Sequence, residues 1–437
     1  MIAAINAGVL LCRHTSSIAR DLKLQISMAR KRILFLAEGA TMAHFVRPLV
    51  LAEALDTSQY EIYFYAPARF SAYLRHKSFI LGELGTMPGE RFLTNIAKGA
   101  PLFPPDVIRD YVKRDCELIR SIGPDLVIGD MRPSLPISAR LEGTSCAVIM
   151  NAYWSPYAKR RSIIPSIPLT RVVPPYLLGP VYRVTEPLAF AIHVGQMNRV
   201  RKEFGIPPLA PDLRMMYTEA DHVLYSDVPE FVPTSGLPKN HHYVGICQWA
   251  PPMPKPDWWQ RMEDDPKPKA LIALGSSGAV RALPALLRAL SKLSVSVVLA
   301  TSGRDMPANA AGMYVADLLP LTETAARCNI VVSHGGSTGV YPAIAAGTPV
   351  LGIPSNADQQ LSAAVLGESG AGLGVRVEEA NEKRLLSALE RLLSDPQYRL
   401  AAKRWAAVFD RYESGALFRK FVDEALSTAP LPGTIPE

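Results

Sequence analysis

A histidine followed by two glycines is the clearest sign of chemistry in the sequence. His334-Gly335-Gly336 comes directly after a short apolar run, and Ser337 and Thr338 follow it. Glycines let the backbone approach a ligand closely, and the unpaired N–H groups at a helix N-terminus bind phosphate. The imidazole and the two hydroxyls add hydrogen-bond donors. The pattern predicts a phosphate site, although a tight turn with a structural histidine explains His-Gly-Gly alone equally well.

A second candidate pair lies far upstream. His44 follows a glycine-containing turn after the apolar run 33–36, and Asp130 ends the run 126–129. A neutral imidazole can take a proton from a hydroxyl group, and a carboxylate can hold its tautomer and stabilise the imidazolium that forms. The pair predicts general-base chemistry. Two structural explanations stay open: His44 with a local hydrogen bond at a helix start, and Asp130 as a cap before Pro133.

Short apolar runs alternate with amphipathic helical patterns in both halves of the chain. This alternation is typical of strand-helix-strand units wound into a parallel sheet, and residues that follow different parallel strands meet at one edge of that sheet. We therefore predict an α/β protein with two doubly wound, Rossmann-like domains. The expected strands are 32–36, 61–65, 126–129, 147–150, 271–274, 295–299 and 330–332, and the expected helices include 45–55, 283–293 and 322–327.

The stretch that starts at His334 resembles the nucleotide-sugar signature of the family 1 (UDP-glycosyltransferase-like) glycosyltransferases. The similarity runs from His-Gly-Gly through a Gly-Thr-Pro turn to the pair Asp358-Gln359. The resemblance implies the GT-B fold, in which two Rossmann-like domains face each other across a cleft. It also implies that His334 contacts the donor diphosphate and that Asp358 and Gln359 hydrogen-bond hydroxyls of the donor sugar. A carboxylate beside an amide can bind two neighbouring hydroxyls.

The resemblance extends to two further donor-site segments. Gly275, Ser276 and Ser277 are similar to the end of a family strand where a serine contacts phosphate. Pro320 matches the proline of the family's base-contacting loop. These residues complete the donor site that the resemblance implies.

Three positions depart from the family pattern. Many members carry a tryptophan and a glutamine where this chain has Leu318 and Leu321, and many place a ribose-binding glutamate where it has Pro342. Base and ribose recognition are therefore left open. The donor is predicted to carry either uridine or thymidine diphosphate.

The segments around His44 and Asp130 resemble the acceptor half of the same family. There a glycine-containing loop leads to a histidine before a helix, and a later strand ends in an aspartate. The resemblance implies that His44 is the catalytic base and Asp130 its partner, in a direct, inverting transfer of a hexose to an acceptor hydroxyl. Neither a cofactor nor a metal is expected, since the sequence carries no metal-ligand motif.

The domain organisation follows from these elements and from a proline-rich segment in mid-chain. Proline cannot join a helix interior or a central strand, so this segment is predicted to be a linker. We expect a poorly ordered extension (1–28), an acceptor-binding domain (29–248), the linker (249–268), a nucleotide-sugar-binding domain (269–410), and a C-terminal helix that returns to the first domain and ends in a tail (411–437).

Composition narrows the functional classes. The 437 residues are 48% hydrophobic and 20% charged, which is ordinary for a globular protein. A net charge of +7 is spread along the chain without a nucleic-acid recognition motif, so no nucleic-acid partner is predicted. Five scattered cysteines, none in a Cys-x-x-Cys pair, favour a reducing compartment. No apolar run is long enough to span a bilayer, and a cytoplasmic protein is therefore predicted.

The acceptor cannot be identified from the sequence, because loops set its shape. One segment, 153–161, combines aromatic residues with a basic run. It is either a solvated loop or a contact with an anionic membrane surface. The predicted acceptor is thus a hydroxyl-bearing small molecule or lipid, and the protein either stays free in the cytoplasm or touches the inner face of the membrane.

Two alternatives compete with a transferase. A nucleotide-sugar epimerase would bind the same donor but needs no acceptor pocket, and the aromatic segment 153–161 argues against it. A non-catalytic donor-binding partner of another enzyme would explain Leu318, Leu321 and Pro342, since weakened nucleotide contacts are expected of a decayed site. The presence of both His44 and Asp130 argues against that alternative.

Overall fold

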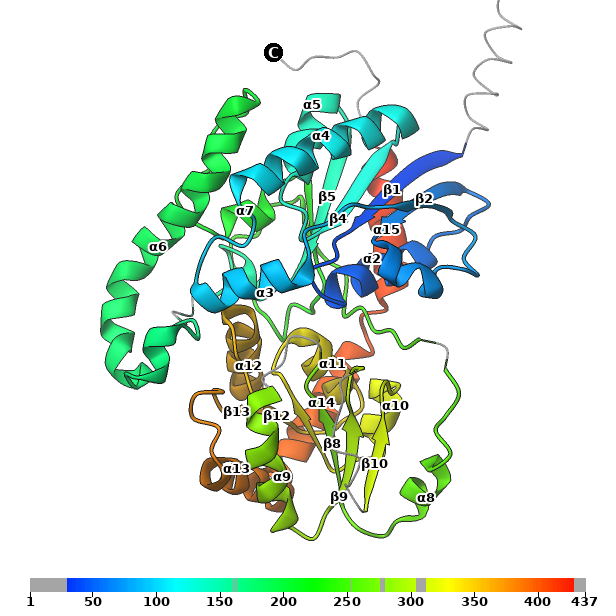
Figure 1. Ribbon diagram of the computed structural model, residues 1–437. Helices are drawn as coiled ribbons and strands as arrows, with labels where there is room; N and C mark the ends of the chain where they lie inside the picture. Colours follow the sequence, from blue (N-terminus) through cyan, green and yellow to red (C-terminus); the bar gives the residue numbers. More distant parts are fainter. Residues whose placement is uncertain are drawn as a thin grey trace, which may run out of the picture.

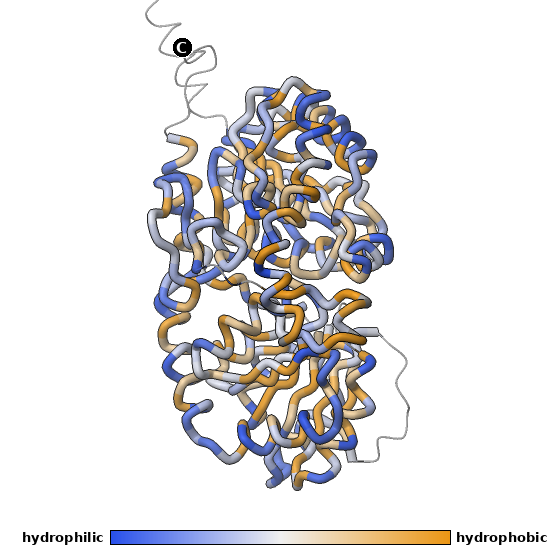
Figure 2. The backbone as a smooth tube through the Cα atoms, turned by 90° about the vertical axis from the view of Figure 1, so that its left-hand side faces the viewer, coloured by the Kyte–Doolittle hydropathy of each residue, from blue (hydrophilic) through white to orange (hydrophobic). Residues whose placement is uncertain are grey.

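A computed structural model describes residues 30–159, 161, 163–251, 253–275, 280–303 and 312–427. These residues form two lobes, one built on each of two parallel sheets (Figure 1). Figure 2 shows the lobes from the side, one above the other. The predicted N-terminal extension, 1–28, lies outside the described residues.

The first lobe is built on a seven-stranded sheet whose order is β3-β2-β1-β4-β5-β6-β7. All of its strand pairs are parallel. The central strands read as continuous apolar runs because helices cover both faces. The strands are β1 (Lys31–Ala37), β2 (Tyr60–Ala66), β3 (Ile80–Glu83), β4 (Leu126–Asp130), β5 (Ser145–Met150), β6 (His222–Tyr225) and β7 (His241–Tyr243).

The second lobe repeats this plan with six parallel strands in the order β10-β9-β8-β11-β12-β13. The prediction of an α/β protein with two doubly wound sheets is therefore confirmed. The strands are β8 (Lys269–Ala273), β9 (Ser296–Ala300), β10 (Met313–Ala316), β11 (Ile330–Ser333), β12 (Val350–Gly352) and β13 (Gly372–Gly374).

The strand order reverses at an equivalent place in both sheets. In the first sheet the reversal lies between β1 and β4, and in the second between β8 and β11. Open parallel sheets bind ligands in the crevice outside the carboxyl ends of the strands at such a switch point. Helix α2 (Ala43–Glu53) follows β1, and α11 (Ser337–Ala345) follows β11, so each helix begins at a switch point.

The other helices cover the two sheets. In the first lobe they are α3 (Gly89–Lys98), α4 (Pro105–Ile122), α5 (Leu135–Glu142), α6 (Pro175–Glu203) and α7 (Met215–Thr218). In the second they are α9 (Leu283–Ser291), α10 (Leu321–Ala326), α12 (Ala357–Ser369), α13 (Glu382–Ser394) and α14 (Pro396–Phe409). None of the described helices is both long and apolar enough to cross a bilayer.

The chain crosses between the lobes twice. Within the segment predicted as a linker, helix α8 (Trp259–Asp264) forms, and Trp258 Nε1 donates to the backbone oxygen of Val315 at 2.8 Å. After α14 the chain returns to the first lobe as α15 (Ser414–Ser427), which packs against α2 (Figure 1). Phe418 of α15 is fully buried there, 6.2 Å from Phe35 between ring centroids.

Candidate active site between the two lobes

His44 and Asp130 meet at the switch point of the first sheet. His44 is the second residue of α2, and its Nδ1 lies 2.8 Å from Oδ1 of Asp130, the last residue of β4. Asp130 is buried, whereas His44 is partly exposed. Because the carboxylate can only accept, Nδ1 carries the hydrogen of a neutral imidazole, and the lone pair on Nε2 is left to accept a proton.

Arg47 is a third member of this cluster, which the sequence analysis missed. Its Nη2 donates to Asp130 Oδ1 at 2.9 Å, and its Nε lies 2.7 Å from Asp130 Oδ2 without hydrogen-bond geometry. Burial alone would lower the pKa of Arg47, but the nearby groups Asp130, Tyr153 and Asp358 together outweigh burial and raise that pKa. A buried cation therefore fixes the carboxylate that holds His44. The available signal was an arginine one turn after His44 on the same helix face.

A second buried ion cluster supports the turns that carry His44 and Asp130. Arg132 Nη1 donates to Glu38 Oε2 at 3.1 Å, and Arg132 Nη2 donates to Asp115 Oδ1 at 2.7 Å, with all three side chains fully buried. Burial raises the pKa of Glu38, although the charge of Arg132 opposes this. Between Asp130 and Arg132, Met131 has φ 54°, a left-handed conformation that is unusual for a residue with a side chain.

His334 lies at the switch point of the second sheet, at the carboxyl end of β11. Its Nδ1 accepts a hydrogen bond from the backbone N–H of Gly336 at 3.0 Å. Burial lowers the pKa of His334, which keeps the imidazole neutral and places its hydrogen on Nε2. Gly275 follows β8 with φ 62°, and a Cβ there would lie 3.0 Å from the His334 ring. The glycine thus leaves room for the histidine beside it.

A hydrogen-bond chain joins the two switch points. Asn151, which follows β5, accepts from Arg47 Nη1 at 2.7 Å and from Ser337 Oγ at 3.2 Å through its Oδ1. Ser337 is the first residue of α11, where the leading N–H groups of the helix have no intrahelical partners. The His44 cluster and the predicted phosphate-binding turn therefore face each other across the two lobes.

Asp358, at the start of α12, also bridges the lobes. Its Oδ1 accepts from Trp154 Nε1 at 2.8 Å and lies 3.1 Å from the Tyr153 hydroxyl. Both aromatic residues belong to the 3-10 turn Ala152–Trp154 after β5. The predicted sugar-binding carboxylate thus contacts the aromatic segment of the first lobe.

The remaining predicted donor residues are spread around this cluster. Gln359 is buried, and its Oε1 accepts from the backbone N–H and the hydroxyl of Ser355, both at 2.9 Å, so this oxygen faces the turn before α12. Thr338 is exposed on the first turn of α11. Pro320 precedes α10, which packs against α11. Ser276 and Ser277 lie outside the described residues.

Asp227 is a buried carboxylate at the same interface that the sequence analysis also missed. It accepts hydrogen bonds from the Ala152 N–H (2.6 Å), from Asn151 Nδ2 (3.1 Å) and from the hydroxyl of Tyr341 on α11. Burial raises the pKa of Asp227 to about 6, although these hydrogen bonds oppose the shift. This group therefore couples contact between the lobes to pH.

Stability is expected to fall as pH rises through the titration of Asp227. An unfolded aspartate titrates near pH 3.9, so between about pH 3.9 and 6 the folded chain binds more protons than the unfolded chain. The free energy of unfolding therefore falls by roughly 1–3 kcal/mol as pH rises across this window. The Asp227→Asn variant cannot lose a proton there. Thermal unfolding at about pH 5 and about pH 7.5 should show a smaller decrease for the variant than for the wild type. Equal decreases in stability for the variant and the wild type would contradict the assignment of this pH dependence to Asp227.

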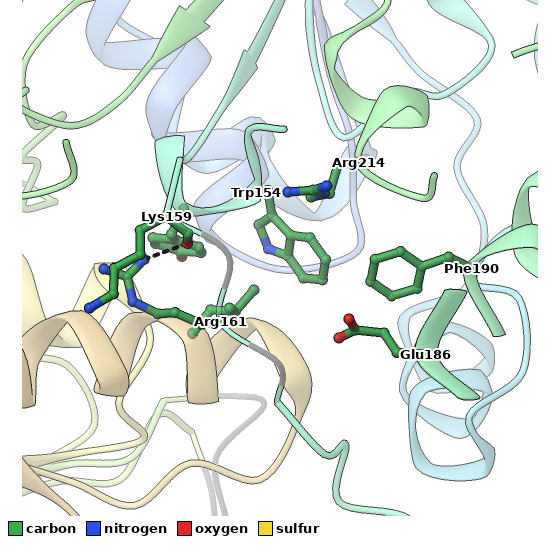
Figure 3. A pocket seen from close by; sticks show the side chains of 8 residues that line it. Trp154, Lys159, Arg161, Glu186, Phe190 and Arg214 are labelled. Atoms are coloured by element: carbon green, nitrogen blue, oxygen red, sulfur yellow. Dashed lines mark hydrogen bonds between the residues drawn. The ribbon is translucent and has the colours of Figure 1, made fainter. Parts of the chain in front are cut away.

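Two pockets flank the interface. One, of about 270 Å³, is lined by Gly275, Leu283, Leu299 and Thr301 at the carboxyl ends of β8 and β9. The other, of about 330 Å³, lies between the turn Ala152–Trp154, α6 and α12. Figure 3 shows Trp154 facing Phe190 and Glu186 of α6 across this second pocket, with Lys159 and Arg161 on its other side. Trp154 thus joins the pocket to Asp358.

Comparison with known proteins identifies the family. Residues 284–409 match the family described as "Erythromycin biosynthesis protein CIII-like, C-terminal domain". The chain is 41% identical over 401 residues to a PGL/p-HBAD biosynthesis glycosyltransferase of Mycobacterium tuberculosis, covering 91% of this chain and 92% of the relative. The chain belongs to the family 1 glycosyltransferases. It is also 40% identical over 409 residues to a PGL/p-HBAD biosynthesis rhamnosyltransferase of Mycobacterium bovis, covering 93% and 90% of the two chains.

Solved structures agree on the fold of this glycosyltransferase. The spinosyn rhamnosyltransferase SpnG complexed with thymidine diphosphate aligns with a TM-score of 0.60 at 16% identity, covering 90% of this chain and all of SpnG. The predicted GT-B fold is confirmed. The alternative of an epimerase gains no support, since the relatives described above are named as transferases.

Proposed function

We propose that this glycosyltransferase transfers a hexose, most simply rhamnose, from a thymidine diphosphate sugar to an acceptor hydroxyl, with inversion at the anomeric carbon and without a metal. One relative is named a rhamnosyltransferase, and SpnG has been solved with thymidine diphosphate. A uridine diphosphate donor is the alternative. The acceptor is a hydroxyl-bearing small molecule or lipid.

The observation that carries this proposal is the hydrogen-bond chain from the His44 cluster to the first turn of α11. It runs from Asp130 through Arg47 and Asn151 to Ser337, with steps of 2.9, 2.7 and 3.2 Å. A base on one lobe and a phosphate-binding turn on the other are the two parts that an in-line displacement needs. The chain links these parts through polar side chains that are all buried.

The reaction follows from the chemistry of these groups. His44 Nε2 takes the proton of the acceptor hydroxyl while the acceptor oxygen bonds to the anomeric carbon. The bond from that carbon to the diphosphate oxygen breaks on the opposite face, and its electron pair leaves with the nucleoside diphosphate. Asp130 stabilises the imidazolium of His44. The N–H of His334 Nε2 and the free N–H groups of α11 stabilise the charge on the leaving group.

The donor sugar would compete for Asp358. In the structure described here this carboxylate accepts from Trp154 and faces Tyr153. Sugar hydroxyls are donors of the same kind and can replace these two side chains, which would free Trp154 to face the neighbouring pocket. Binding of the donor would in this way shape the acceptor side of the cleft.

His334→Ala is expected to weaken binding of thymidine diphosphate by about tenfold or more, because one hydrogen bond to a charged group contributes roughly 1.5–3 kcal/mol. Calorimetric titration of the wild type and the variant with thymidine, uridine and guanosine diphosphates would measure these affinities. We expect the thymidine nucleotide to bind tightest to the wild type.

His222→Ala is the matched control. His222 begins β6 and therefore lies at the amino-terminal edge of the first sheet, away from the cleft. Its replacement should leave nucleotide affinity unchanged. If the wild type binds none of the three diphosphates, or if His334→Ala binds as tightly as the wild type, the proposed donor site is wrong.

A further inference from the structure

Exposed aliphatic side chains are concentrated on one segment of the first lobe. Among the described residues, seven of the twelve exposed large hydrophobic side chains fall between positions 169 and 192. Five of them are on α6: Leu177, Val181, Val184, Leu188 and Ile192, with 56–80% of each side chain exposed. A contiguous apolar surface of this kind marks an interaction site more often than scattered exposed residues do.

The five side chains form one continuous stripe, the α6 stripe. They are spaced by four, three, four and four residues, which places them within an arc of about 80° on a helix with 3.6 residues per turn. At about 1.5 Å per residue, the stripe extends over about 22 Å. A helix of a globular protein normally places polar residues on such an exposed face.

The stripe points away from the body of the protein. On the opposite face of α6, Val194 is buried, and Met197 and Val200 are buried in a cluster with side chains of α4. Glu186 and Phe190 on the inner side line the pocket beside Trp154. In Figure 1, α6 forms the outer edge of the first lobe, so the described part of the chain leaves the α6 stripe uncovered.

Basic residues continue the exposed face beyond the stripe. Arg199 and Lys202 are exposed, and the helical periodicity puts them on the same side of α6 as Val184 and Leu188. Among the described side chains of α6, the exposed acidic residue is Glu203, which pairs with Arg109 at 2.5 Å. The face therefore joins an apolar stripe to a positive end, in a chain of net charge +7.

We propose that the α6 stripe, together with Arg199 and Lys202, is a docking surface for an anionic lipid bilayer. An interfacial helix buries its apolar face at the boundary between headgroups and acyl chains, and cationic side chains add attraction to anionic lipids. α6 combines these two features on one face. Docking needs neither the donor nor the reaction proposed above, so it can be tested separately from them.

A second copy of the chain fits this face less well. Two stripes packed together would bring Arg199 and Lys202 into the interface, where the exposed acid of the helix, Glu203, is already paired. Buried charges without partners oppose association. A bilayer, in contrast, supplies anionic headgroups along its whole surface.

Docking through α6 would place the pocket beside Trp154 close to the bilayer. The stripe and the pocket-lining side chains Glu186 and Phe190 lie on opposite sides of the same helix. An α-helix with its side chains is about 10–12 Å thick, so only this distance would separate the headgroup layer from the pocket.

Flotation with vesicles tests the proposal. The wild-type chain should bind vesicles of phosphatidylcholine with about 30 mol% phosphatidylglycerol at least about tenfold more tightly than pure phosphatidylcholine, because the docking face is cationic. Val184→Glu with Leu188→Glu should reduce this binding by about tenfold or more, because both charges enter the apolar layer. Arg199→Gln with Lys202→Gln should weaken binding to the anionic vesicles alone.

Leu400→Glu is the matched control, since Leu400 is a similarly exposed aliphatic residue on α14. It should bind vesicles as the wild type does. Circular dichroism and thermal unfolding would show that the stripe variants remain folded. Two outcomes would overturn the proposal: vesicle binding that the stripe variants retain, or a wild-type dimer without vesicle affinity that becomes a monomer when the stripe is charged.

Discussion

Replacement of His44 by alanine is expected to lower kcat by about 10²- to 10⁴-fold, the usual contribution of a general base. The affinity for the nucleoside diphosphate should remain unchanged, because the proposed donor contacts lie on the second lobe. The physical reason is the position of the ring: Nδ1 is held at 2.8 Å from Asp130, which leaves Nε2 to accept the proton of the acceptor. Steady-state kinetics with thymidine diphosphate rhamnose, together with nucleotide titration, would measure both quantities.

Two aspartates of the first lobe provide a further test, Asp130, and its matched control, Asp125. Asp130→Asn should lower kcat in the same direction as His44→Ala, since the amide can hold the wrong tautomer of the ring. Asp125 lies before β4, where its side chain accepts from Lys31 Nζ and from the Arg32 N–H, both at 2.8 Å. Asp125→Asn should leave kcat unchanged. A His44→Ala variant that keeps wild-type kcat would remove His44 from the mechanism.

Replacement of Arg132 by methionine is expected to lower the free energy of unfolding by about 3–5 kcal/mol, the usual effect of breaking a buried ion pair. Glu38 and Asp115 would be left as buried carboxylates without their cation. The native pKa of Glu38, which burial already raises, would rise further without the charge of Arg132, so the variant should lose more stability than the wild type as pH rises above about 4.3, where an unfolded glutamate titrates. Urea unfolding at two pH values would measure the effect.

Arg120→Met is the control for the loss of an arginine. Arg120 pairs with Glu142 at 2.6 Å, but most of its side chain is exposed, so its replacement should change stability by about 1 kcal/mol or less. Adding Glu38→Gln and Asp115→Asn to Arg132→Met should recover part of the lost stability, because the unpaired charges are removed. Equal effects of Arg120→Met and Arg132→Met would contradict the role of the buried cluster.

The sequence predicted the elements whose patterns are local. Apolar runs before His44, Asp130, Gly275 and His334 are strands in the structure, and each of these residues ends or follows a strand next to a switch point. Such runs, with glycines at tight turns, are readable because the residues that create the pattern are neighbours in the chain. Six short strands were not predicted, because three or four residues are too few to give a clear periodic signal: β3, β6, β7, β10, β12 and β13.

The contacts between the lobes could not be predicted. Asn151, Asp227 and Arg47 come from separate elements, and the conformation of their partners decides whether they bond or face solvent. The bounds of helix α6 were not predicted, for a different reason. It contains Pro180 and Pro187, which normally end a helix, and its exposed aliphatic face gives no amphipathic pattern directed toward a core.

The return of α15 to the first lobe has a consequence for how the chain is made. Tyr60 of β2 bonds to Asp423 of α15 at 2.5 Å, across 363 positions of sequence. At about 5–20 residues per second, a ribosome needs roughly 20–70 s to synthesise that interval. During this time the side of the first sheet that Phe418 covers has no partner, although all seven strands of that sheet are synthesised before the second lobe begins. The nascent first lobe is therefore expected to need a chaperone until its last helix is translated.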